Sequence, residues 1–269
     1  DPLCLDVFWG RTRLRGHALP ETLISHSGRA DAGRFSFIRS VRIAVHPDRR
    51  RLGLASRLID AVHAHYNPDF FGTLFGLTKD LLAFRRHVGY DLVRLGASRG
   101  TRTGEPAAVM LRPVSPRAKA LYGELRQDWA RDLPTQLDLM TAGDDFIMGD
   151  PLRMDVFHGL PQPSFLDDQT VRRMVAAFAF GPRILEAAAP GLERFALRHR
   201  AELDDLPSSD QALIQTRLLE RRSWGDTMLK ANLTSIPATM RAFRRAIRTF
   251  VRQADPSIKG NERTDLDEA

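Results

Sequence analysis

The chain has 269 residues, of which 43% are hydrophobic and 27% are charged, a balance that excludes a collagen-like or mainly disordered protein. Its single cysteine, Cys4, excludes a disulfide framework and a zinc finger, and it favours a reducing compartment, which we expect to be the cytoplasm. No apolar run approaches the roughly 20 residues of a membrane-spanning helix. The net charge is +7, and residues 1–115 carry 18 basic and 10 acidic side chains against 22 and 23 in residues 116–269, an excess that suits a polyanionic partner.

The first part of the chain alternates strand and helix patterns. Runs of β-branched and aromatic residues predict strands over residues 41–45, 71–77, 92–95 and 107–111. Apolar residues at helical spacing predict a helix from Leu54 to His65, and Thr78 and Gly89 are suited to begin and end a second helix over residues 79–88. This order predicts an α/β domain over residues 1–115.

Strand patterns nearly vanish beyond Pro113 and Pro116, which mark a predicted domain boundary. Helical periodicity predicts helices over residues 117–130, 170–180, 183–188, 192–202, 209–222 and 238–253. Residues 132–164 are rich in Pro, Gly and Asp and are predicted to be connecting loops, and residues 259–269 are predicted to be a frayed tail. Residues 116–269 are therefore predicted to form a mainly α-helical C-terminal domain.

The loop before the helix at Leu54 carries the clearest functional pattern. Backbone N–H groups at a helix N-terminus, together with the helix dipole, favour a phosphate group. Gly53 lets the backbone approach a ligand closely, and Arg49, Arg50 and Arg51 add positive charge. The sequence contains neither a Walker Gly-Lys-Ser/Thr motif nor a Gly-x-Gly-x-x-Gly loop, which excludes two other phosphate-binding patterns.

The spacing Arg50-x-x-Gly53-x-Ala55 resembles the acetyl-CoA pyrophosphate loop of the GNAT N-acetyltransferases. The resemblance implies an α/β GNAT-like acetyltransferase core, in which Phe84-x-x-x-x-Gly89-Tyr90 ends the following helix. It also implies the residues that bind acetyl-CoA, namely Ile43, Ala44 and Val45 on the strand and Arg50, Arg51, Leu52, Gly53, Leu54, Ala55 and Ser56 in the loop. A backbone N–H of the strand is the expected donor to the oxyanion of acyl transfer.

Longer segments resemble the bacterial tRNA(Met) cytidine acetyltransferase family. The resemblance is dense over residues 8–115 and thinner beyond, and its clearest segments are residues 10–17, 41–47, 75–78, 94–96, 167–168 and 176–180. It implies acetyl-CoA-dependent N4-acetylation of the wobble cytidine of elongator tRNA(Met). It also implies an upstream helicase-like domain that uses ATP or GTP and is missing here, so we expect a piece of a larger enzyme whose first GNAT strands lie before Asp1.

The helix over residues 79–88 places Asp80, Phe84 and His87 on one face. If this face borders the cofactor, Asp80 and His87 are the titratable cofactor-binding groups nearest the thioester; the alternative is that they interact with the dipole at the two helix ends. Many GNAT enzymes place an acid tyrosine just after the aromatic residue of this helix, where this chain has Arg85. No catalytic acid or base is assigned, and His46 is interpreted as a structural residue.

Arginines indicate RNA contacts in three places. Arg11, Arg13 and Arg15 alternate in a basic stretch, and Arg99 and Arg102 lie in a Gly-rich turn. In the tail, one predicted helix face carries Arg241, Arg244, Arg245, Arg248 and Arg252 opposite Phe243, Ile247 and Phe250. This pattern is typical of a surface that binds a nucleic acid backbone, and the alternative for each group is a solvated surface.

Two other functions stay open at this stage. The chain can be a GNAT enzyme that acts on a protein or small-molecule amine, or a non-catalytic RNA-binding platform. The intact Arg50-x-x-Gly53-x-Ala55 spacing argues against the platform, and the helical tail argues against an unrelated amine substrate. The expected partners are tRNA and the upstream helicase-like domain, and neither a membrane nor a metal ion is expected.

Overall fold

The computed structural model describes residues 2–99, 104–142 and 148–260. An N-terminal segment contains α1 (Pro2–Phe8), α2 (Ala18–Ser25) and the 3-10 helix η1 (Ala30–Arg34). The sheet region contains β1 (Phe37–Ser40), the 3-10 helix η2 (Pro47–Arg49), α3 (Leu54–His65), β2 (Phe70–Gly76), α4 (Lys79–His87), β3 (Asp91–Arg99) and β4 (Pro106–Pro113).

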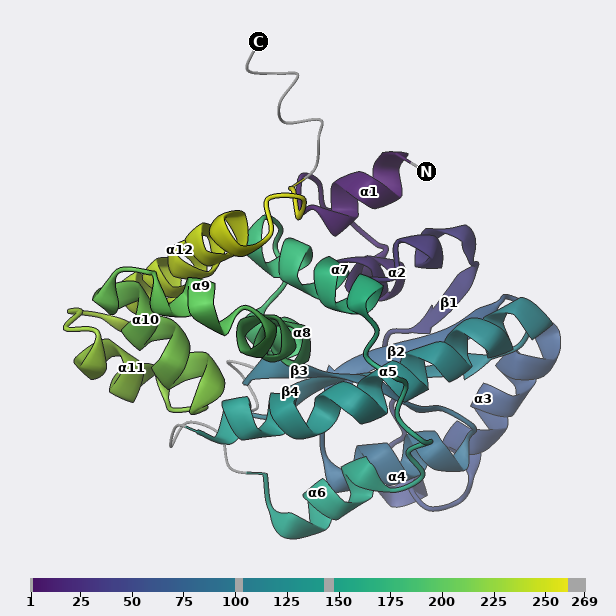
Figure 1. Ribbon diagram of the computed structural model, residues 1–269. Coiled ribbons are helices and arrows are strands. Elements are labelled where there is room, and N and C mark those ends of the chain that lie inside the picture. The colour runs from purple at the N-terminus through teal and green to yellow at the C-terminus, as the bar shows by residue number, and fades with distance from the viewer. Residues whose placement is uncertain (1, 100–103, 143–147, 261–269) are drawn as a thin grey trace.

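The rest of the chain is helical (Figure 1). It contains α5 (Pro116–Thr141), α6 (Asp150–Phe157), α7 (Asp168–Ala179), α8 (Leu185–Arg198), α9 (Arg200–Asp204), α10 (Ser208–Ile214), the π-helical turn η3 (Gln215–Leu219), α11 (Trp224–Lys230) and α12 (Ile236–Ala254). This order confirms a mixed α/β chain with a helical second part. Among the described residues, no helix combines the length and the apolar character needed to cross a lipid bilayer.

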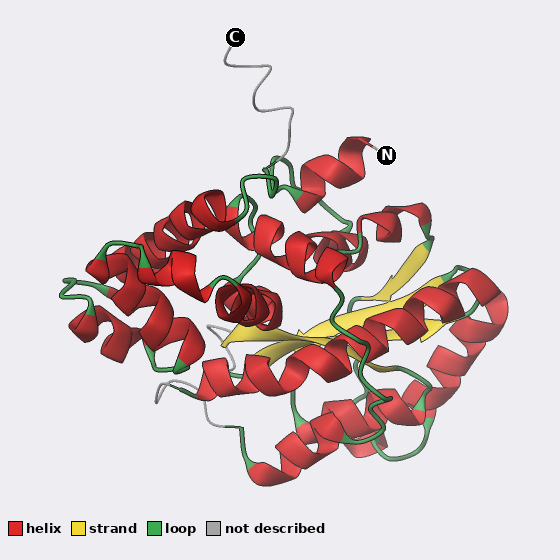
Figure 2. Ribbon diagram, in the orientation of Figure 1, coloured by secondary structure: helices red, strands yellow, loops and turns green. Residues whose placement is uncertain are grey.

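The strands lie in the order β1-β2-β4-β3, with β1 and β2 parallel and the other neighbours antiparallel. Side chains of β4 alternate between two apolar layers, because successive residues of a strand point to opposite faces. Ala108 and Met110 pack in one layer with α3 and α4, whereas Val109 and Leu111 pack in the other with α1 and α2. Figure 2 shows the sheet between these helices. Because both faces are covered, a ligand has access mainly to strand ends and loops.

Helix α5 covers the outer edge of β3, the edge strand. Arg126 donates a hydrogen bond to the carbonyl of Leu92 (2.9 Å), and Gln136 donates one to the carbonyl of Leu95 (2.8 Å). These side chains satisfy backbone groups that an uncovered strand edge would leave unpaired. The predicted division between residues 115 and 116 therefore falls at the start of a helix that packs on the sheet, and it stays a prediction.

Part of the loop predicted over residues 132–164 is helical. Residues 132–141 continue α5 through Pro134, and α6 lies in the same predicted loop. The prediction was wrong because it followed the Pro, Gly and Asp content, whereas Leu133 and Leu137 are buried in the layer that contains α3 and α4. Burial of this apolar face outweighs the one backbone donor that Pro134 removes.

The helical region confirms the predicted helices α7 and α12 and corrects those between them. Residues 183–188 and 192–202, predicted to be two helices, instead form the single helix α8, which continues through Pro190, and the short α9. A Cβ on Gly191 would lie 2.7 Å from the Cβ of Met174, so α7 and α8 approach closely there. The helix predicted over residues 209–222 is α10 followed by η3. These boundaries depend on packing between helices, which periodicity alone does not specify.

Candidate functional site

Strands β1 and β2 separate at Ser40. They pair from Phe37 opposite Phe70 to Ser40 opposite Thr73, whereas β2 stays paired with β4 as far as Gly76. Residues 41–46 leave the sheet without regular secondary structure, so the strand predicted over residues 41–45 is wrong. The alternating β-branched residues favour an extended chain, but a strand also requires a partner, and β2 has none on this side beyond Thr73 in the described part of the sheet.

The segment from Val41 to His46 presents free backbone N–H groups. Within the described residues, none of these N–H groups donates a hydrogen bond to another protein group. The side chain of Ile43 packs partly against the apolar layer of α3 and α4, while Ala44 is exposed. The residues predicted to hold the acyl end of the cofactor therefore lie along an open backbone edge that can donate to carbonyl oxygens.

The loop from Pro47 to Gly53 turns sharply into α3. The side chain of His46 accepts a hydrogen bond from the N–H of Asp48 (3.4 Å) at the start of η2. The structural role of His46 stays a prediction. Arg51 (φ 64°) and Gly53 (φ 73°) both take the left-handed conformation. Only glycine adopts this conformation without an energetic penalty, so the loop depends on Gly53 and places Arg51 under backbone strain.

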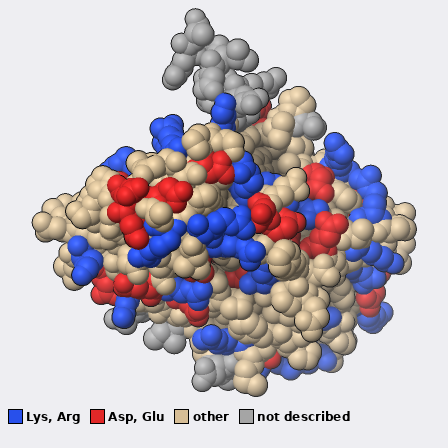
Figure 3. Space-filling view, in the orientation of Figure 1, with Lys and Arg blue, Asp and Glu red and all other residues tan. Residues whose placement is uncertain are grey.

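Helix α3 begins at Gly53 without a side-chain cap. The N–H of Arg57 donates to the carbonyl of Gly53 (2.9 Å), so the N–H groups of Leu54, Ala55 and Ser56 have no partner within the helix. A Cβ on Gly53 would meet no atom within 4 Å, which leaves open space in front of the helix. Arg50, Arg51 and Leu52 are exposed beside it, and Figure 3 shows Lys and Arg side chains, with some Asp and Glu among them, along the side of the molecule where α3 lies. This arrangement suits an anion.

A polar chain fixes α3 against the sheet. Arg112 donates to Nδ1 of His63 (2.9 Å), and Nε2 of His63 lies 3.0 Å from the hydroxyl of Tyr90. Because a guanidinium can only donate, Nδ1 accepts and the ring proton is on Nε2, facing Tyr90. Burial, and then the charge of Arg112, lower the pKa of His63, so the imidazole is neutral at pH 7. The neutral tautomer holds α3, and hence the loop, in place.

Helix α4 places Arg85, which was not predicted to belong to the site, at the point where β1 and β2 separate. Asp80 and His87, the two titratable groups predicted to face the cofactor, are exposed. Arg85 is instead only 6% exposed, and its guanidinium donates to the hydroxyl of Ser40 (3.2 Å), the last residue of β1. The sequence contained a signal for this burial, because Leu82 and Arg85 are three residues apart and share the buried face of α4.

Arg85 is a buried cation with few partners. Its second terminal nitrogen, Nη1, is buried and has no hydrogen-bond partner in the described structure. The rings of Phe84 and Tyr90 lie 5.7 Å from the guanidinium carbon, within the range of cation–π attraction. Burial lowers the pKa of Arg85, although a guanidinium remains charged at neutral pH. The site thus combines positive charge with the free N–H groups of residues 41–46.

The predicted RNA-binding arginines of the first part are only partly described. Arg11, Arg13 and Arg15 are exposed in the segment between α1 and α2, and Arg11 forms an ion pair with Asp6 (3.2 Å). Arg99 is the last residue of β3, and Arg102 lies outside the described residues. None of these arginines belongs to the loop over residues 47–53 that precedes α3.

The tail arginines divide into two kinds. Arg241 and Arg245 are exposed, whereas Arg244 and Arg248 bind the C-terminal end of α7. Arg244 donates to the carbonyls of Phe178, Gly181 and Arg183, and Arg248 donates to the carbonyl of Ala179 (3.0 Å). The carbonyls of Phe178 and Ala179 lie at the negative end of the α7 dipole, so the two guanidinium groups cap that helix.

The same four arginines line a groove of about 440 Å³ between α8, α11 and α12. Trp224 and Met240 contribute apolar surface to it. Phe243, Ile247 and Phe250 of α12 are buried, as the sequence predicted, and Phe243 also lines the groove. The groove therefore combines exposed positive charge with an aromatic side chain, a combination that suits a nucleic acid with unstacked bases.

No protein-family model matches the chain, but curated relatives match along most of its length. The chain is 31% identical to the tRNA(Met) cytidine acetyltransferase of Nitrosococcus halophilus over 91% of its residues. The corresponding identities are 34% over 77% of the chain for the enzyme of Yersinia pestis and 28% over 93% for that of Haloferax volcanii. The chain belongs to the tRNA(Met) cytidine acetyltransferase family. It spans about a third of the length of these relatives, 33%, 29% and 33% respectively.

Proposed function

We propose that this chain is the acetyltransferase and tail part of an enzyme that acetylates N4 of the wobble cytidine of elongator tRNA(Met), with acetyl-CoA as the donor. The observation that carries the proposal is the identity to tRNA(Met) cytidine acetyltransferases over 91% of the chain, which includes both the sheet and the helical region. In this proposal the sheet with α3 and α4 is a GNAT-like core, and an upstream helicase-like domain that uses ATP or GTP is the partner within the whole enzyme, which works in the cytoplasm with its tRNA.

The residues around α3 fit acetyl-CoA. The N–H groups of Leu54, Ala55 and Ser56 are free to bind a pyrophosphate, and the space that a Cβ on Gly53 would enter is open. The exposed guanidinium groups of Arg50 and Arg51 add charge beside it. When bound there, acetyl-CoA supplies a thioester as the acyl donor, and the N–H groups of Ile43, Ala44 and Val45 would hold its acyl end.

Acetyl transfer to cytidine requires catalysis because the N4 amine of cytidine is a weak nucleophile. Its lone pair is delocalised into the ring, so holding the amine against the acyl carbon supplies much of the rate gain. Negative charge develops on the acyl oxygen during attack, and free N–H groups of residues 41–46 can donate to it. We place the cation of Arg85 behind this edge, where its contact with Ser40 orients it and its charge favours the developing oxyanion.

The tail supplies RNA contacts in this proposal. Arg241 and Arg245 are exposed and can neutralise phosphates, whereas Arg244 and Arg248 shape the groove by capping α7. Trp224 offers a ring on which a base can stack. Arg11, Arg13, Arg15 and Arg99 remain proposed RNA contacts in the first part of the chain.

The proposal is tested by acetyl transfer from radiolabelled acetyl-CoA to an elongator tRNA(Met) transcript, with the rest of the enzyme supplied as a separate polypeptide. The matched control is the same transcript with its wobble cytidine replaced by uridine, which lacks the N4 amine. We expect label in the first transcript only. Label in both transcripts, or in neither while acetyl-CoA binds, would reject the proposed substrate.

Binding of the cofactor is tested separately by calorimetric titration of the chain with acetyl-CoA. Gly53→Glu places a carboxylate in the open space before α3, where it repels a pyrophosphate, and should abolish binding. The matched control is Gly123→Glu on α5, where a Cβ also meets no atom within 4 Å but which is remote from the loop in the chain. Equal binding by both variants would remove the loop from the cofactor site.

A further inference from the structure

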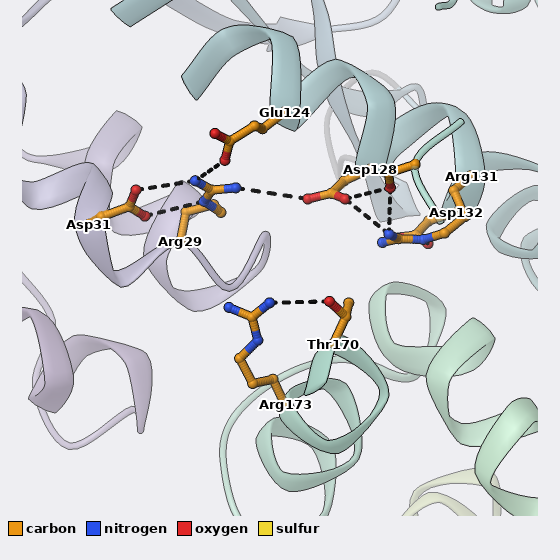
Figure 4. Close-up of polar contacts among 9 residues, drawn as sticks. Arg29, Asp31, Glu124, Asp128, Arg131, Asp132, Thr170 and Arg173 are labelled. Carbon is orange, nitrogen blue, oxygen red and sulfur yellow. Dashed lines mark hydrogen bonds and ion pairs between the residues drawn. The ribbon is translucent and has the colours of Figure 1, made fainter. Parts of the chain in front are cut away.

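A second site lies where residues 26–29, β3, α5 and α7 meet. A cavity of about 90 Å³, partly open to solvent, lies there, with Arg94 and Arg183 among its lining residues. Figure 4 shows polar side chains around it, with Arg29 and its partners on one side and Arg173 with Thr170 on the other. The proposed acetyl-CoA site uses none of these residues, so the cavity is a separate feature of the molecule.

Two arginines in the cavity are buried without partners. Arg94 is 8% exposed and Arg183 is 4% exposed. In the described part of the chain, neither guanidinium donates a hydrogen bond or forms an ion pair within 4 Å, and Nε of Arg183 is fully buried. Burial lowers the pKa of each group to about 10, and in Arg94 the charge of Arg183 adds to the effect. Both groups are therefore cations at neutral pH.

The neighbouring carboxylates are already engaged. Asp132 accepts from Arg131 through both oxygens (2.7 and 3.0 Å), and Asp128 accepts from Arg131 (2.9 Å) and from Ser164 (2.8 Å). Arg29 interacts with three carboxylates, those of Asp31, Glu124 and Asp128. Glu186, whose charge also acts on Arg94, forms its ion pair with Arg217 (3.7 Å). The charges of Asp132 and Asp128 also act on Arg183. Among the described residues, the protein thus pairs Arg29 and Arg131 directly with carboxylates but gives Arg94 and Arg183 no carboxylate within 4 Å.

Further donors face the same cavity. Nε1 of Trp129, which can only donate, is buried without a partner, and so is Nδ1 of His26. Burial, together with Arg94, Arg183 and Arg13, lowers the pKa of His26 to about 4, so its ring is neutral and carries one N–H at pH 7. Gly28 approaches Arg183 so closely that a Cβ there would lie 2.0 Å from Nη2. The cavity is therefore rich in donors and poor in free acceptors.

An unpaired buried cation is strongly unfavourable, and two together are more so. A ligand with several acceptor oxygens removes this penalty, and a planar guanidinium binds a phosphate through two parallel hydrogen bonds. The cavity volume of about 90 Å³ exceeds what one or two waters need and has room for one tetrahedral group. We propose that this cavity is a binding site for a single phosphate group, held by Arg94 and Arg183 at its base and approached between Arg29 and Arg173.

The phosphate can be free or belong to a nucleotide. The group would bind by the same contacts in either case, because Arg94 and Arg183 would recognise the phosphate oxygens themselves. Arg173 is exposed and, within the part of the chain that the structure describes, donates only to Thr170 (3.1 Å), so it can contact the rest of a nucleotide outside the cavity. The site goes beyond the proposed acetyl transfer and does not depend on it.

The test is thermal unfolding of the chain in sodium phosphate against sodium chloride at equal ionic strength, with calorimetric titration by phosphate alongside. At about tenfold excess over Kd, phosphate should raise the unfolding temperature by a few degrees. Arg183→Met and Arg94→Met should remove this shift and weaken binding at least tenfold. Each should unfold at the same temperature as the wild type or higher in chloride, because each removes an unpaired buried charge.

Arg153→Met is the matched control, since Arg153 is exposed on α6 and remote from the cavity lining, and it should keep the full shift. No shift in the wild type, or an equal shift in the wild type and both cavity variants, would overturn the proposal. Acetate as effective as phosphate would also overturn it, because it would indicate a carboxylate site. Stronger binding of adenosine monophosphate or a 5′-phosphorylated RNA than of inorganic phosphate would support the site and assign the phosphate to a nucleotide.

Discussion

Replacing Gly53 by alanine tests the cofactor loop with a single methyl group. The added Cβ meets no atom within 4 Å, so no steric clash contributes. The remaining effect is conformational, because Gly53 has φ 73° and an L-residue pays about 1–2 kcal/mol for the left-handed region. We expect Gly53→Ala to lower the free energy of unfolding by about that amount if the loop keeps its shape. If the loop relaxes instead, acetyl-CoA should bind roughly 5- to 30-fold more weakly.

Chemical denaturation and calorimetric titration together distinguish these two results. The control is Arg51→Asn in the same loop, at φ 64°, because asparagine tolerates the left-handed region better than arginine. We expect Arg51→Asn to leave stability unchanged or raise it by a few tenths of a kcal/mol. Unchanged stability and unchanged affinity in Gly53→Ala, or an equal loss of stability in both variants, would refute the proposed conformational cause.

Three further predictions concern charged side chains. Arg85→Met should slow acetyl transfer by about 10- to 100-fold while changing the free energy of unfolding by less than about 1 kcal/mol, because it removes a poorly partnered buried cation; an unchanged rate would exclude Arg85 from the reaction. Arg241→Glu combined with Arg245→Glu should weaken tRNA binding, measured by filter binding, and reduce its salt slope by roughly 2. Arg244→Ala should mainly lower the free energy of unfolding, measured by denaturation, by about 2 kcal/mol. The opposite pattern would mean that Arg244 binds RNA and that Arg241 and Arg245 are structural. The pKa of His26 is about 4 in the folded chain and 6.5 in the unfolded one, so at this residue only the unfolded state gains a proton as pH falls from 7 to 5. The free energy of unfolding, measured by denaturation, should therefore drop by about 1–2 kcal/mol over that range. An unchanged dependence of the free energy of unfolding on pH in His26→Gln would contradict this.

Family resemblance and local patterns determined much of the candidate site from the sequence. The Arg50-x-x-Gly53-x-Ala55 spacing identified the turn before α3, and the structure places two left-handed residues and three free N–H groups there. Helix periodicity also identified the buried face of α12, because that periodicity is a local property of the chain. The cofactor and RNA roles of these residues stay predictions.

Other features were decided by residues far apart in the sequence. The β-branched run over residues 41–45 favours a strand, yet β1 ends at Ser40 because its partner β2 is paired only to Thr73 on that side. Helical spacing indicated Asp80 and His87, whereas packing buried Arg85 against Ser40, 45 residues earlier in the chain.

The same distinction holds for the arginines. Composition shows an excess of positive charge, but sequence does not show which guanidinium groups find partners. Arg244 donates hydrogen bonds to carbonyls that lie more than 60 residues earlier in the chain. Arg94 and Arg183 meet in one cavity, where no carboxylate of the described residues forms a direct ion pair with either of them. The sequence by itself therefore determined the family, the helical faces and the glycine turn, which depend on short-range geometry. The tertiary structure decided which strands pair and which charges are buried, because pairing and desolvation depend on segments that only folding brings together.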